Sequence, residues 1–106
     1  MGMAAQGAKP IGAEIRVVPA TLTAVTAKDT WITSIHVANV TGTAATLLVQ
    51  DTAGTPLTLI PTESIAPNTA KTWSWSGRGI KLAGGLKWQA GTASALHGVI
   101  IGASVP

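Results

Sequence analysis

The chain carries few side chains that could do chemistry: four carboxylates, two histidines and no cysteine among 106 residues. The carboxylates are Glu14, Asp29, Asp51 and Glu63. Asp29 and Asp51 fall in expected turns, where a carboxylate commonly accepts backbone hydrogen bonds. No motif sets two of the four as an acid and base pair, and no nucleophile motif is present. We therefore predict no catalytic residue and no enzymatic activity.

The two histidines, His36 and His97, lie in different expected strands. A transition-metal site needs at least one more good ligand and groups that orient it. We therefore predict no metal site and no cofactor, and expect two partly buried, neutral, hydrogen-bonded imidazoles. No glycine-rich phosphate cradle is expected, because the run at 77–79 is too short and the glycine at 54 opens no helix.

The aromatic side chains are more informative, because all four are tryptophans: Trp31, Trp73, Trp75 and Trp88. Apolar alternation around Trp31 and Trp88 predicts that both belong to the core. Trp73 and Trp75 share one face of an expected strand with Lys71. This leaves three interpretations open: core packing, a protein interface where tryptophan is enriched, or a platform for sugar rings. The candidate interface or glycan contacts are Trp73, Trp75, Lys71 and Arg78.

Charged residues make up 10% of the chain, against about 25% in an ordinary soluble domain. Such a surface, rich in threonine, serine, glycine and alanine, is typical of a protein that functions in contact with other proteins. A weakly charged free monomer is the alternative. The net charge of +3 comes from seven scattered basic residues, which form no patch for nucleic acid. Two long charge-free runs, 30–50 and 88–106, contain too many polar residues to predict a membrane span.

The first residues lack the basic and apolar regions of a signal peptide, so we expect synthesis in the cytoplasm without cleavage. Residues 1–13 are small and broken by glycine, and Pro10 and Gly12 mark their end. We predict an extended N-terminal arm over 1–13, docked on the domain or on a neighbouring subunit. A single domain is expected over 14–106.

Residues 30–40 form the clearest strand, since they are β-branched, aromatic and alternating. One face is expected to carry Trp31, Thr33, Ile35, Val37 and Asn39. The other is expected to carry Ile32, Ser34, His36, Ala38 and Val40. Neither face has a charge and both have apolar side chains, which predicts a central strand covered on both sides.

Further strands are expected over 44–50, 55–60, 69–76, 80–83, 86–90 and 94–103, with two more within 14–26. A hairpin turn is expected over 51–54, Pro61 should end the strand before it, and 62–68 should be a loop or a short irregular strand. No helical period appears. The pattern predicts an all-β antiparallel sandwich of about eight short strands, of jelly-roll or immunoglobulin-like type.

These strands resemble the small β-sandwich proteins of tailed-bacteriophage virions, namely capsid decoration (cement) proteins and domains of head fibres and tail appendages. The resemblance rests on the segments at 30–39, 44–50 and 79–90. It implies a structural virion component, assembled in the host cytoplasm, that binds the major capsid protein and forms homo-oligomers, with trimers favoured. Two alternatives stay open: a tail or fibre domain that takes part in host attachment, and a carbohydrate-binding module using Trp73 and Trp75.

Overall fold

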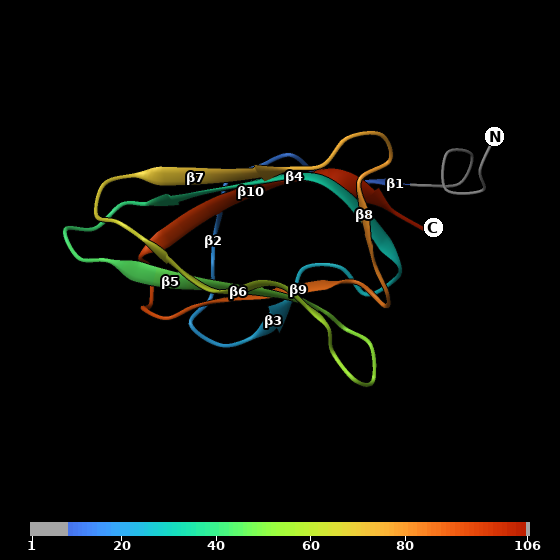
Figure 1. Ribbon diagram of the computed structural model, residues 1–106, viewed down its shortest axis with the longest axis horizontal. Helices are drawn as coiled ribbons and strands as arrows, with labels where there is room; N and C mark the ends of the chain where they lie inside the picture. Colours follow the sequence, from blue (N-terminus) through green and yellow to red (C-terminus); the bar gives the residue numbers. More distant parts are fainter. Residues whose placement is uncertain (1–8, 106) are drawn as a thin grey trace.

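The computed structural model describes residues 9–105, which form two antiparallel sheets packed face to face (Figure 1). Sheet A, the upper layer in Figure 1, contains β1 (Lys9–Pro10), β2 (Arg16–Val17), β4 (Thr30–Asn39), β7 (Ala70–Ser74), β8 (Ile80–Leu82) and β10 (Leu96–Ser104). Sheet B contains β3 (Thr23–Ala24), β5 (Ala45–Asp51), β6 (Thr58–Ile65) and β9 (Leu86–Ala90). The predicted all-β sandwich is confirmed.

The strands pair in nested order along the chain. Strand β5 pairs with β6, β4 with β7 and β8, β3 with β9, and β2 with β10. Such nesting is a long hairpin rolled into two layers, which is the jelly-roll arrangement. The prediction of about eight strands fell short of ten, and the strand that lies outside every expected range is β1, a two-residue segment at the edge of sheet A; β8 falls within the strand expected over 80–83.

The core lies between the layers and follows strict alternation on β5, where Ala45, Leu47 and Val49 are buried. Trp88 of β9, only 2% exposed, is the largest fully buried side chain, as the sequence predicted. It reaches sheet A over Gly98, where an added Cβ would lie 2.9 Å from the Trp88 ring. The sandwich therefore closes over this tryptophan because β10 has no side chain beneath it.

Strand β4 is central, as predicted, but its alternation is interrupted. The β4–β10 register pairs Ile101 with Ser34 and then Gly102 with Ile32, which leaves Thr33 as an extra residue, a β-bulge. The bulge turns Ile32 into the core and Trp31 outward. The predictions that Trp31 belongs to the core and shares a face with Ile35 are therefore wrong.

The prediction that β4 is covered on both faces is also wrong for the described chain. Sheet B covers the inner face, where Ile35 and Val37 have no exposed surface. On the outer face His36 is exposed, so this histidine is not partly buried as expected. The apolar content of the outer face thus needs another explanation than intramolecular burial.

Strand β6 also departs from expectation. Pro61 does not end it, because β6 continues to Ile65 at the edge of sheet B, where a missing backbone donor is tolerated. The register with β5 shifts on either side of Val49. The predicted hairpin turn at 51–54 is instead part of a longer connection over 52–57.

Most of the expected arm, residues 1–8, lies outside the described residues. The following residues are docked on this domain: Lys9 and Pro10 pair with the end of β10, and Ile11 N donates to Gly102 O at 2.9 Å. Ile11 also packs against the core. Residues 9–11 therefore belong to the sandwich.

Candidate protein interface

The outer face of sheet A is defined by burial alternation and strand register. On β4, His36 is exposed between the buried Ile35 and Val37. Residues paired directly across an antiparallel sheet point to the same face. The outer face of sheet A therefore comprises Pro10, Val17, Trp31, Ser34, His36, Ala38, Ala70, Thr72, Ser74, Lys81, His97, Val99, Ile101 and Ala103.

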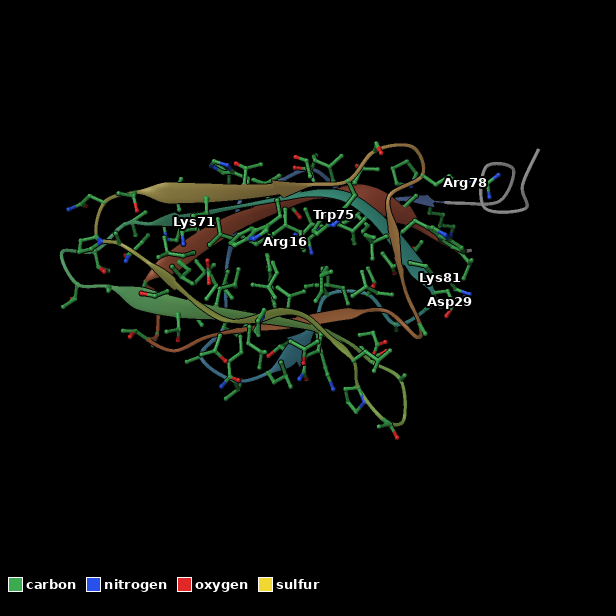
Figure 2. The ribbon with its side chains drawn as sticks, in the orientation of Figure 1. Arg16, Asp29, Lys71, Trp75, Arg78 and Lys81 are labelled. Atoms are coloured by element: carbon green, nitrogen blue, oxygen red, sulfur yellow. The ribbon has the colours of Figure 1, made fainter. Side chains whose placement is uncertain are left out.

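Among these fourteen described residues, Lys81 is the only lysine, arginine, aspartate or glutamate. It lies at one end of the face and is engaged there: its Nζ is 3.6 Å from Asp29 Oδ2 and 5.7 Å from the centroid of the Trp31 ring. Figure 2 shows Lys81 and Asp29 together at that end of the sandwich. The remainder of the face carries no such charge.

Large apolar side chains stand exposed on this face. Val17 is 54% exposed and Ile101 43%. The outer side of sheet B is more polar, with Gln50, Lys87 and Gln89 at outward positions. Contiguous uncharged and partly apolar surface is typical of protein contact sites, so the outer face of sheet A is the candidate interface.

The structure separates the four residues singled out from the sequence. Lys71, Trp73 and Trp75 lie on the same inward side of β7 and its extension, and both tryptophans pack against the core. Figure 2 labels Lys71 and Trp75. Arg78 is exposed in the turn that follows, well away from Lys71. Of the three interpretations left open for Trp73 and Trp75, the packing agrees with core filling; a flat platform facing solvent is not formed.

Two carboxylates hold loops in place. Asp51 Oδ1 accepts from Ala53 N at 3.3 Å, the local turn contact expected from the sequence. Asp29 Oδ1 instead accepts from the distant Gly84 N at 2.7 Å. This hydrogen bond, and after it the charge of Lys81, hold the pKa of Asp29 below its ordinary value of 3.8.

The other two carboxylates pair with cations: Glu63 with Lys71 at 2.9 Å and Glu14 with Arg16 at 3.7 Å. Within residues 9–105, no group of three or more histidine, cysteine, aspartate or glutamate side chains is placed to hold a metal ion. That same stretch contains no helix long and apolar enough to cross a membrane. Each of the four carboxylates therefore has a hydrogen-bond or ion-pair partner within the described chain.

Two hollows in the surface lie beside the ends of strands. One, of about 190 Å³, lies between β8 and the β5–β6 connection and is lined by Asp51, Leu57 and Lys81 among others. Another, of about 340 Å³, lies beside Lys9, Val25 and Ser104. The charged residues of the first hollow are already engaged, Asp51 with Ala53 N and Lys81 with Asp29, so the outer face of sheet A stays the best candidate.

Sequence reasoning missed this surface, although one signal was present. Gly102 lies inside the last strand, where glycine often marks a bulge or a close backbone approach. A Cβ there would collide with the backbone carbonyl of Trp31.

Comparison with known proteins adds nothing to the geometry: no family model, no curated protein and no solved structure matches this chain.

Proposed function

We propose that this protein is a non-enzymatic structural component of a bacteriophage virion, and that it decorates the capsid as a cement protein. The observation that carries the proposal is the outer face of sheet A, with Val17 and Ile101 exposed and Lys81 as its one full charge among the described residues. Jelly rolls recur in viral capsid proteins, which supports the same proposal by analogy of fold.

In this proposal the outer face of sheet A packs on the major capsid protein or on a further copy of the chain, in a homo-oligomer for which a trimer is favoured. The chain would be incorporated in the host cytoplasm and remain in the virion. Each contact buries a modest apolar area, and mass action favours the assembled state over free subunits. Repetition over a symmetric lattice would turn weak contacts into firm retention.

The proposal can be tested by mixing purified protein with undecorated phage heads and imaging the particles by electron microscopy. Saturating, symmetric occupancy that raises the temperature at which the heads disrupt is the expected result. Absence of head binding would overturn the cement role. Binding to tails or fibres would then support the host-attachment alternative, and glycan binding without any virion contact would support a carbohydrate-binding module.

A further inference from the structure

The two histidines, which are 61 positions apart in sequence (97 − 36), are brought together on one surface. His36 on β4 is opposite Val99 on β10, and His97, two residues before Val99, is opposite Ala38. Both imidazoles belong to the outer face of sheet A. Diagonal neighbours of this kind lie roughly 7–8 Å apart, within reach of long and aromatic side chains.

The ring of His36 is already oriented. Its Nδ1 lies 2.7 Å from Thr72 Oγ1 on the neighbouring strand β7. When Nδ1 donates to the threonine oxygen, Nε2 is left unprotonated, with its lone pair available outside the sheet. Metal-ligating histidines are commonly fixed in this manner, through a hydrogen bond from the ring nitrogen that does not bind.

None of the described residues that pair with the two histidines in sheet A carries a full charge. Direct neighbours of the two histidines on β4, β7, β10 and β2 are Ala38, Thr72, Val99 and Val17. The one lysine of this face, Lys81, is opposite Trp31 at the far end of β4, where it contacts Asp29. Among the described residues of this face, a cation approaching the imidazoles therefore meets neither a carboxylate that would hold a protonated histidine nor a nearby ammonium group.

We propose that His36 and His97 form a two-imidazole site for a borderline divalent transition-metal ion such as Zn²⁺, Ni²⁺ or Cu²⁺. Imidazole nitrogen is a preferred ligand of these ions, with Zn–N distances of about 2.0–2.1 Å. Water completes the coordination, since the described residues supply no group of three ligands. The site is open and exchangeable, with Thr72 as the positioning residue for His36.

Zinc titration of the full-length, tag-free chain by calorimetry tests the site, with His36→Asn, His97→Asn and the double variant. The chain has two histidines and no cysteine, so the double variant removes every imidazole and thiolate. One ion per chain is expected. Loss of either histidine turns a chelate into a single contact and weakens binding roughly a hundredfold. Thr72→Val, which keeps both rings, weakens it about tenfold.

Two controls decide the outcome. Mg²⁺, which prefers oxygen ligands, should not compete, and acid should release zinc because protonated imidazole cannot bind a metal. Single variants that melt and bind zinc as the unaltered chain does would overturn the proposal, as would one ion per two chains with dimer formation. Because the measurement uses the isolated chain, its result does not depend on whether the protein binds phage heads.

Discussion

Lys71 Nζ lies 2.9 Å from Glu63 Oε1 and thereby joins the edge strand β7 of sheet A to the edge strand β6 of sheet B. The same ammonium group donates to Ser64 O at 3.0 Å. The contact closes one side of the sandwich next to Trp73, which packs against the core. Both charged side chains are more than two-fifths exposed, at 42% and 44%, so solvent screens their attraction.

This exposure limits what the ion pair contributes. In a double-mutant cycle with Lys71→Met and Glu63→Gln, we expect a coupling energy of about 0.2–1 kcal/mol, which should decrease with added salt. Methionine preserves much of the apolar stem of lysine, so the cycle isolates the charge. Urea denaturation of the four proteins gives the coupling. A value of several kcal/mol, insensitive to salt, would show that the pair is shielded from water.

We expect the loss of unfolding free energy on replacing each tryptophan by alanine to follow how deeply that tryptophan is buried. Trp88→Ala removes a side chain that is 2% exposed, and we expect a loss of about 3–5 kcal/mol in unfolding free energy. Trp73→Ala and Trp75→Ala remove half-buried rings and should each cost less, about 1–3 kcal/mol. Denaturation curves measure the three values.

A glycan array run on the Trp73→Ala/Trp75→Ala double variant separates packing from sugar binding. The packing seen here predicts lost stability and no glycan signal in either protein. A double variant that melts as the unaltered chain does yet loses a glycan signal would favour the carbohydrate-binding alternative.

Sequence periodicity predicted the fold class and most strands because buried and outward positions alternate clearly, as in β5 and β9. It failed where alternation depends on the partner strand. The bulge at Thr33 arises from the register against Ile101 and Gly102, which are distant in sequence. Trp31 therefore pointed the wrong way in the prediction, although its strand was correctly placed.

The candidate interface was hidden for the same reason. Val17, His36 and Ile101 become one surface only when β2, β4 and β10 lie side by side, an order that no local pattern specifies. Low overall charge led us to expect a protein that contacts others, and this stays a prediction. The sequence could not say that the charge is absent chiefly from one face.

Asn39 ends β4 as a fully buried and fully bonded amide. Its Nδ2 donates to Thr43 O at 2.8 Å and to Ile65 O at 3.0 Å, and its Oδ1 accepts from Thr41 N at 2.9 Å. We expect Asn39→Ala to lower the unfolding free energy by about 2–4 kcal/mol, because buried backbone groups lose their partners. Chemical denaturation measures it. Thr41→Val is a smaller perturbation of the same network, because it removes only the hydrogen bonding of Thr41 Oγ1, which donates to Asn39 Oδ1 at 2.7 Å. If Asn39→Ala lowered the unfolding free energy by less than Thr41→Val does, the amide of Asn39 would not be the centre of this network.

Asp29 should make stability depend on acidity. Its folded-state pKa lies below 3.8, so the fold favours the ionised carboxylate. That contribution is present above the unfolded-state pKa and is lost as pH falls through the lowered folded-state value. Asp29→Asn should therefore flatten the decline in urea midpoint at acidic pH. Glu14→Gln, which removes a carboxylate 3.7 Å from Arg16, is the matched control; an equal flattening in both would count against the Gly84 hydrogen bond as the cause.

Charge placed on the outer face of sheet A should prevent assembly without unfolding the chain. Val17→Glu and Ile101→Glu each add a carboxylate at a position more than two-fifths exposed, so the isolated protein should melt within a few degrees of the unaltered one. In a packed interface the same carboxylate would be buried without a partner, which costs several kcal/mol.

Head occupancy of these variants should therefore fall at least tenfold, since each 1.4 kcal/mol is a factor of ten in affinity. Ala24→Glu, an exposed position on β3 beside Lys87 in sheet B, adds the same charge away from the proposed contact and should bind normally. Equal loss in all three variants would mean that net charge, and not this face, governs attachment. Unchanged binding by Val17→Glu and Ile101→Glu would assign the contact to another surface.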